Sequence, residues 1–133
     1  METIRTIVCK LDPTPEQVVE IDATSRVFAH ACNHIADVCR AIHSTNKVTV
    51  QHACYGEVRA QFGLSANLAI RAIARVCAAL KAQDRMHSTF EPSSVDFDVR
   101  TFRFREEDWT FDLRFLESRQ RIATILGKRQ KAL

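Results

Sequence analysis

Residues 3–22, TIRTIVCKLDPTPEQVVEID, decide the fold because they change from a strand pattern to a helix pattern within a few positions. Apolar and β-branched residues favour extended backbone up to Asp12, and the proline that follows keeps Asp12 out of helical geometry. Thr14 has the chemistry of a helix N-cap, Pro15 suits the first helical position, and Gln17 completes a capping box. The sequence therefore predicts a strand that hands over at once to a helix.

Three helices are predicted after this turn. Apolar residues recur at three- and four-residue intervals over residues 15–43, which predicts one long amphipathic helix. A second helix is expected to start at a Thr49 cap and to end at Gly63. Ser65 is the predicted cap of a third helix, whose apolar stripe extends to residue 80. The three stripes can be buried against one another.

The period changes to two near residue 93, which indicates strands. Residues 93–116, SSVDFDVRTFRFREEDWTFDLRFL, alternate apolar and polar residues with two polar breaks, and predict a three-stranded antiparallel meander. Residues 122–125 are compatible with either a strand or a helical turn. The simplest account buries the aromatic face of this sheet. Its other face, toward water or a ligand, would then carry Asp96, Asp98, Arg103, Arg105, Asp112 and Arg114.

The order of these elements predicts an α+β topology. The partners for the first strand come only after the helices, so the helices form an insertion into a small, mostly antiparallel sheet or barrel. We expect a first barrel strand in residues 1–12, a helical insertion in residues 13–85, and the remaining strands with a basic tail in residues 86–133.

Composition adds bounds on the class of protein. A length of 133 residues with 46% hydrophobic residues fits a single globular domain. No apolar run approaches a membrane helix and the N-terminus has no signal-peptide core, so we expect a cytoplasmic protein with no membrane partner. The 5 cysteines are scattered, which favours reduced thiols over a disulfide framework.

Positive charge is concentrated in two places. Residues 58–83 contain no acid, and within them Arg71 and Arg75 lie one helical turn apart with Asn67, an arrangement able to follow phosphates. Residues 119–133 also lack acids and would form a basic arm through Arg119, Arg121, Lys128, Arg129 and Lys131. The alternative for each set is an ordinary solvated surface. Aromatic residues on the sheet can likewise stack on bases, although a core role is the simpler one.

The sequence gives no sign of catalysis or of a cofactor. No set of acids suits a two-metal site, and neither phosphate-binding glycine pattern occurs. His30 and His34 are spaced for a shared metal, with Cys39 nearby, but zinc sites usually come with short Cys or His clusters that are absent here. We therefore expect no catalytic residue, no metal and no cofactor.

Four stretches together resemble a known family. They are IRTIVCKLDPTPEQ, the ACN of residues 31–33, LSANLAIRAIARVCAALK, and VDFDVRTFRFREEDWTFDLRFLESRQRI. In order and spacing they are similar to the N-terminal part of the TnpB (OrfB) transposon-encoded proteins, relatives of the type V CRISPR effectors. The resemblance covers nearly the whole chain. It implies an OB-like wedge barrel with a helical recognition domain inserted after the first strand, and partners that are a structured guide RNA and its DNA target.

The resemblance also implies what lies outside the chain. The family cuts DNA with a RuvC-like domain that is downstream of this region, beyond Leu133, so we expect a nucleic-acid-binding module without the nuclease. For Asn33, inside the first helix, it implies a structural or RNA-contacting role, with a core hydrogen bond as the alternative. The alternative function is a protein–protein assembly module, either a homo-oligomer or a docking partner of a separate nuclease domain.

Overall fold

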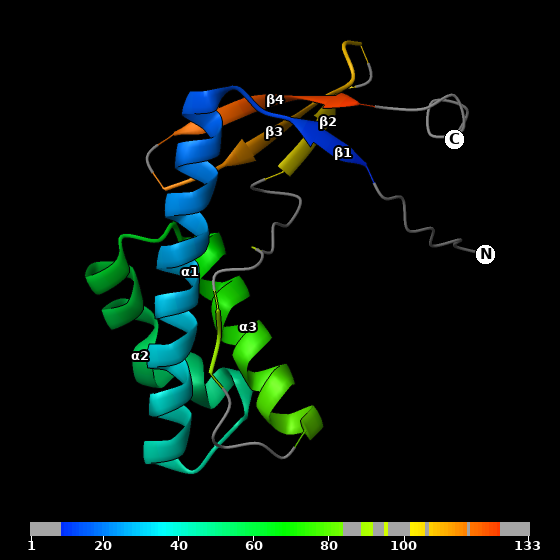
Figure 1. Cartoon of the computed structure of the whole chain (residues 1–133). Coiled ribbons are helices and arrows are strands. Elements are labelled where there is room, and N and C mark those ends of the chain that lie inside the picture. Colours follow the sequence, from blue (N-terminus) through cyan, green and yellow to red (C-terminus); the bar gives the residue numbers. More distant parts are fainter. Residues whose placement is uncertain are drawn as a thin grey trace, which may run out of the picture.

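The computed structural model describes residues 9–83, 89–91, 95, 102–105, 107–116 and 118–125. Within these ranges the chain forms helices and an antiparallel sheet (Figure 1), which confirms the α+β class. The elements in chain order are β1 (Lys10–Asp12), α1 (Pro15–Ile42), α2 (Lys47–Phe62), α3 (Ala66–Gln83), β2 (Phe102–Arg105), β3 (Thr110–Arg114) and β4 (Arg119–Ile125).

The sheet has the order β1-β4-β3-β2. β1 pairs antiparallel with β4, with Lys10 opposite Ile125, so the first strand does find its partner at the other end of the chain. The ambiguous residues 122–125 belong to strand β4. The expected strand near residues 95–97 lies outside the described residues except for Val95, which is not in a strand.

The described sheet is open, so the prediction of a closed OB-like barrel is wrong for this part of the chain. Closure requires the two edge strands to pair, and here β1 and β2 are opposite edges of the sheet. β1 has three residues and β2 has four, so both are short. The strands lie as an open layer beside the end of α1 where that helix begins (Figure 1).

The start of α1 has the predicted capping box. Thr14 Oγ1 accepts a hydrogen bond from the backbone N–H of Gln17 at 3.2 Å, and Gln17 Oε1 accepts from the backbone N–H of Thr14 at 3.0 Å. The helix ends where His43 adopts the left-handed conformation, with φ 52°. The sharp change at the opening of the chain is therefore fixed by local hydrogen bonds.

The caps of the next two helices differ in how well the sequence predicts them. α2 begins at Lys47, because Asn46 Oδ1 accepts from the backbone N–H of Thr49 at 3.1 Å. The prediction of Thr49 as the cap is therefore wrong: Asn46 is the cap, and Thr49 donates the N–H that it accepts from. Gly63 ends α2 with φ 65°, and Ser65 caps α3 as predicted, its Oγ lying 3.3 Å from the backbone N of Leu68.

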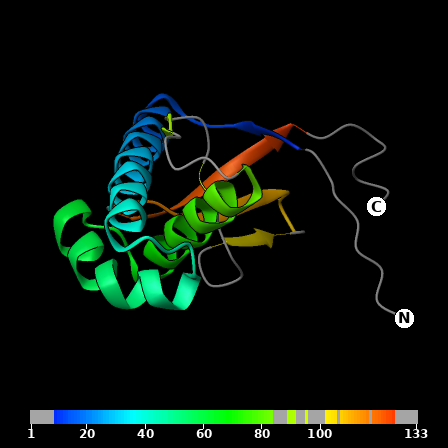
Figure 2. The ribbon, with the colours of Figure 1, turned by 90° about the horizontal axis from the view of Figure 1, so that it is seen from below.

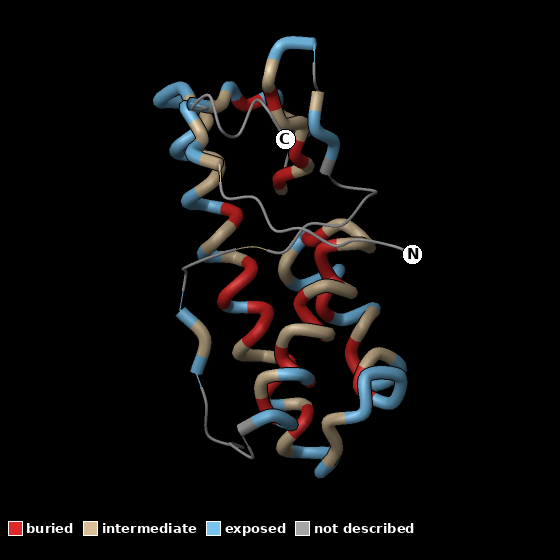
Figure 3. The backbone as a smooth tube through the Cα atoms, turned by 90° about the vertical axis from the view of Figure 1, so that its right-hand side faces the viewer, coloured by how far each residue is buried: buried red, intermediate tan, exposed pale blue. Residues whose placement is uncertain are grey.

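Two clusters of buried side chains hold the fold. The larger one fills the space among the three helices (Figure 3), and its bulkiest members are Phe28, Ile35, Leu68, Ile73 and Leu80. A smaller cluster under the sheet consists of Leu113, Phe115 and Ile122, with Leu11, Ile21 and Phe111 against it. Seen from below, the helices gather to one side and the strands extend beyond them (Figure 2).

The first half of α1 joins the two clusters. Ile21 packs on the sheet, and Gln17 Nε2 donates to the backbone carbonyl of Arg121 on β4 at 2.8 Å. The hydroxyl of Thr24, fully buried, accepts from the backbone N–H of Leu116 at 3.4 Å. By strand alternation, the face with Leu113 and Ile122 is turned toward α1, and the sheet arginines lie on the other face.

Candidate nucleic-acid interface

A groove of about 610 Å³ lies between the start of α2 and α3. Its cationic side chains come from both helices, and its remaining lining is small or polar. It is lined by Thr45, Asn46, Lys47, Arg71, Ala74, Arg75, Cys77, Ala78 and Lys81. The two arginines that the sequence singles out on α3 therefore do line one site, and two lysines join them there.

Local structure explains how the cations meet. The Asn46 cap makes Lys47 the first residue of α2, and the short turn after α1 brings this end of α2 beside α3. On α3, Arg71 and Arg75 are one turn apart, and Lys81 lines the groove nearer the C-terminal end of the helix. Alanines between them keep the groove open.

Arg75 is oriented by a ring beneath it. Its guanidinium carbon lies 5.0 Å from the centroid of Phe28, a fully buried residue of α1. A guanidinium above an aromatic face is a cation–π contact, and the ring restricts the side chain. Arg75 is therefore half-buried and packed, in contrast to the solvated helical face expected from the sequence.

The charged side chains in the described lining of the groove are all cationic. Among the described residues that line it, none is Asp or Glu, and the first turn of α2 also has no acid. The free N–H groups of a helix start add partial positive charge to that of Lys47. The arrangement suits an anion with several charged oxygens.

The other predicted binding residues lie elsewhere. Asn67 is on α3 one turn before Arg71 and does not line the groove. Arg119 and Arg121 are on strand β4, so they belong to the sheet and not to a C-terminal arm. The rest of the proposed arm, Lys128, Arg129 and Lys131, lies outside the described residues.

Two groove residues, Lys47 and Lys81, were not among the predicted binding residues. The expectation that Thr49 caps α2 placed Lys47 before the helix, where its direction could not be inferred. The signal that could have found it is Asn46, a better N-cap residue than threonine, immediately before Lys47. Lys81 stands in the acid-free segment, but only tertiary structure brings it near α2.

The arginines on the sheet are partly matched by acids. Arg121 Nε lies 3.5 Å from Asp112 Oδ1, and its Nη1 lies 3.9 Å from Asp108 Oδ2. Arg105 Nε is 3.6 Å from Asp108 Oδ1, an ion-pair distance without hydrogen-bond geometry. The hydrogen bond from Thr110, and then the charges of Arg105 and Arg121, lower the pKa of Asp108. This face is therefore closer to charge balance than the groove.

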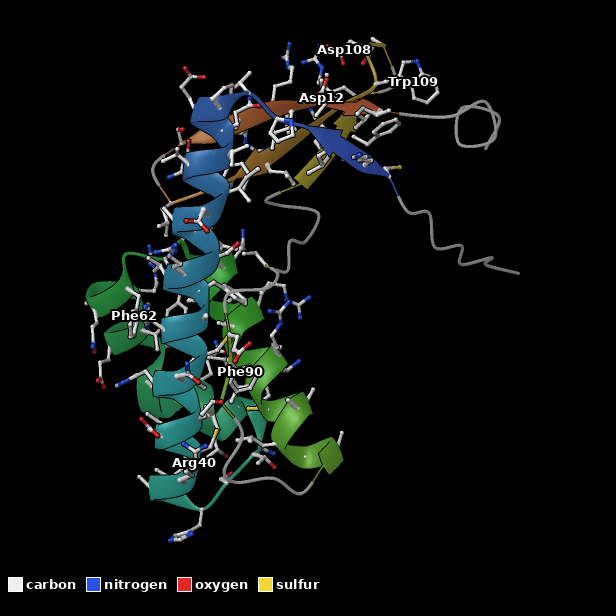
Figure 4. All side chains as sticks on the ribbon, in the orientation of Figure 1. Asp12, Arg40, Phe62, Phe90, Asp108 and Trp109 are labelled. Atoms are coloured by element: carbon white, nitrogen blue, oxygen red, sulfur yellow. The ribbon has the colours of Figure 1, made fainter. Side chains whose placement is uncertain are left out.

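Asn33 has a structural partner. Its Nδ2 donates to the backbone carbonyl of Phe90 at 2.9 Å, and its Oδ1 accepts from the backbone N–H of Phe90 at 2.7 Å. Phe90 packs against the helical core between α1 and α3 (Figure 4). Both ends of the amide are engaged in this pair, which accounts for an asparagine in the middle of a helix.

The expected burial of the aromatic face holds only in part. Leu113 and Phe115 are buried, but Phe104 on the edge strand β2 is 40% exposed. Its ring centroid lies 5.0 Å from that of Phe111 and 5.8 Å from that of Trp109. Trp109 and Phe111 are both half-buried. An aromatic group thus reaches the surface at the end of the hairpin.

His30, His34 and Cys39 do not converge on one another. His34 Nε2 lies 2.9 Å from Glu57 Oε1, His30 is exposed, and Cys39 is buried. In the part of the chain that the structure describes, no group of three or more such side chains could hold an ion. Burial raises the pKa of Cys54 to about 11 and that of Cys77 to about 12, so these thiols are protonated at neutral pH.

Comparison with protein-family models, with curated proteins and with solved structures finds no match for this chain. Among the described helices, none combines the length and apolar character needed to cross a membrane.

Proposed function

We propose that the protein binds nucleic acid, with a structured RNA as its principal partner, through the groove between α2 and α3. The observation that supports this most directly is the convergence of Lys47, Arg71, Arg75 and Lys81 on a groove with no acid in its described lining. Phosphate contacts from lysine and arginine supply most of the affinity in sequence-independent nucleic-acid binding.

The dimensions of the groove suit a strand better than a single phosphate. Arg71 and Lys81 are ten positions apart on α3, which at 1.5 Å per residue corresponds to roughly 15 Å along the helix. Lys47 stands on the facing wall, so a strand lying along α3 would meet cations on two sides. Four charges spread over this length would engage several successive phosphates.

The groove is a better phosphate site than the sheet. Asp108 and Asp112 already accompany Arg105 and Arg121, so a phosphate that approaches there meets negative charge as well. In the groove, neutral alanines lie between the cations. We therefore assign the main contact to the helices and a lesser one to the strands.

The resemblance to the N-terminal region of TnpB-like proteins gives the proposal its finer form. On that basis the RNA is the guide-type RNA of an RNA-guided nuclease, the DNA target is the second partner, and the chain acts in the cytoplasm as a recognition module that contributes no catalytic group. Helices inserted between a first strand and the rest of an antiparallel sheet are compatible with this form.

Fluorescence anisotropy of a labelled hairpin RNA at several salt concentrations tests the proposal. Four phosphate contacts predict a slope of log affinity against log salt of about −3. Arg71→Ala combined with Lys81→Ala should make the slope less negative by about 1.5 and should weaken binding. Arg75 is left intact because it packs on Phe28.

The matched control is Lys10→Ala combined with Arg26→Ala. It removes the same charge from exposed sites outside the groove, one of them already paired with Asp22. The control should bind RNA much like the parent. Equal losses in the two double variants, or no loss in either, would show that the groove is not the binding site.

An assembly module is the second candidate function. Val18 and Val19 near the start of α1 are 50% and 70% exposed, which leaves adjacent apolar side chains in water. Sedimentation velocity decides between the two functions. A concentration-dependent oligomer that disappears in Val19→Lys, together with unchanged RNA affinity in the groove variant, would favour assembly.

A further inference from the structure

The groove between α2 and α3 offers a ligand positive charge but no ring on which a base could stack. Its described lining contains no aromatic residue. Phe28, the ring that Arg75 covers, is fully buried on α1 and does not line the groove. Proteins that hold unpaired bases without sequence preference combine a cationic groove with aromatic side chains. The described lining has the first of these features and not the second.

Neutral polar side chains of the lining are engaged within the protein. Asn46 Oδ1 accepts from the backbone N–H of Thr49 at 3.1 Å and from the Thr49 hydroxyl at 3.2 Å. An asparagine reads adenine by using its amide oxygen and its amide N–H together, and the cap already occupies this oxygen. The thiol of Cys77 is hydrogen-bonded to that of Cys39. The lining therefore offers little that could distinguish one base from another.

The cations, by contrast, suit a row of phosphates. Arg71 and Lys81 are roughly 15 Å apart along α3 at 1.5 Å per residue, with Arg75 between them. Lys47 lines the groove from the first turn of α2. Four charges over this length correspond to about one per 4 Å, close to the one charge per roughly 3.4 Å that each strand of a DNA duplex carries along the helix axis. Guanidinium and ammonium groups both donate to phosphate oxygens.

We propose that the groove recognises a chain of phosphates without reading what the phosphates carry, so that inorganic polyphosphate is a ligand of the same groove. This inference rests on the groove of the proposed function and adds a second class of ligand to it. Inorganic polyphosphate is a linear polymer whose phosphates are joined directly, so it carries more charge per unit length than a nucleic-acid strand and has no bases to accommodate. Because one groove serves both polymers, polyphosphate competes with RNA.

Isothermal titration calorimetry measures this binding directly, with pyrophosphate, tripolyphosphate and long-chain polyphosphate as probes. Affinity should rise with chain length, because only a long chain contacts Lys47, Arg71 and Lys81 together. Arg71→Ala combined with Lys81→Ala should weaken binding of the long chain by at least about tenfold, the loss expected from two contacts between charged groups.

The matched control is again Lys10→Ala combined with Arg26→Ala, which removes the same charge from β1 and from the first half of α1. This control should bind long-chain polyphosphate much like the parent. Competition is followed by the anisotropy of a labelled hairpin RNA, which unlabelled polyphosphate should return to the value of the free RNA. Two unlabelled hairpins of equal length and different sequence should displace the labelled one equally well.

The outcomes separate this inference from the proposed function. If RNA binding depends on Arg71 and Lys81 but polyphosphate neither binds nor displaces the RNA, the inference is wrong and the proposed function stands. If polyphosphate binding depends on these two residues while no RNA binds, the inference holds and the proposed function is wrong. Equal losses of polyphosphate binding in the groove variant and in the control would overturn the inference. A preference for one hairpin sequence that disappears in the groove variant would overturn it as well, because the groove would then read bases.

Discussion

Replacement of Asn33 by alanine decides between its two expected roles. The change removes two hydrogen bonds to the backbone of Phe90, of 2.9 and 2.7 Å, in a part-buried setting. Each bond contributes about 1 kcal/mol, and a buried N–H left without a partner costs about 1–3 kcal/mol. Alanine recovers up to about 0.7 kcal/mol through its better helix propensity. We therefore expect Asn33→Ala to lower the free energy of unfolding by about 1–3 kcal/mol.

Urea denaturation followed by circular dichroism measures this loss, with His30→Ala as the control. His30 is exposed on the same helix one turn earlier, so its replacement tests helix propensity alone and should change stability by less than about 0.5 kcal/mol. Hydrogen exchange gives a local readout, because the Phe90 N–H should exchange faster in Asn33→Ala.

The reasoning is refuted if Asn33→Ala is as stable as the His30 control and the Phe90 amide exchanges at the parental rate. If that variant also binds RNA more weakly, the RNA-contacting role takes the place of the structural one. Asn33→Asp separates the two hydrogen bonds, since a carboxylate can accept from the Phe90 N–H but cannot donate to its carbonyl. It should retain part of the stability that alanine loses.

Four further variants test the first helix cap, two glycines and the buried thiols. Thr14→Ala should cost about 1 kcal/mol by loss of the capping box, measured by urea denaturation. Gly56→Ala should stabilise by roughly 0.5–1 kcal/mol because a Cβ there meets nothing within 4 Å, whereas Gly63→Ala, at φ 65°, should destabilise; thermal melts of both give the signs. Burial raises the pKa of Cys54 from 9.0 to about 11 and that of Cys77 from 9.0 to about 12. The folded protein therefore keeps these protons at a pH where the unfolded chain loses them. Stability should therefore be unaffected below pH 9 and fall as pH rises toward 11, with a shallower fall in the Cys54→Ala/Cys77→Ala variant.

Features governed by a few neighbouring residues were predictable from the sequence. The Thr14 capping box, the Ser65 cap and the Gly63 stop each depend on contacts within about four positions, and the structure has all three. The prediction of Thr49 as the α2 cap failed at the same scale, because Asn46 is the cap. Two capping residues three positions apart compete, and the preceding turn selects the first.

Features that join distant parts of the chain were harder to predict from the sequence. The pairing of the first strand with the last follows from the need to satisfy a strand edge, but the open order of the sheet depends on strand lengths and twist that the pattern does not contain. Asn33 bonds to a residue 57 positions later in the chain. Lys47 and Arg71 line the same groove only because the turns before and after α2 bring α3 beside the first residues of α2. The sequence shows a basic segment without acids, but not that cations of α2 and α3 line one groove.

The spacing of the groove cations limits the kind of ligand that can use all of them. Arg71 and Lys81 are ten positions apart on α3, roughly 15 Å at 1.5 Å per residue, and Lys47 stands across the groove as the first residue of α2. A nucleotide or a single phosphate could contact only some of these side chains at a time. A polymer can contact all of them, and a phosphate held at one end of the groove then raises the effective concentration of the next phosphates along the strand. This geometry therefore favours a nucleic-acid strand over a small anionic ligand.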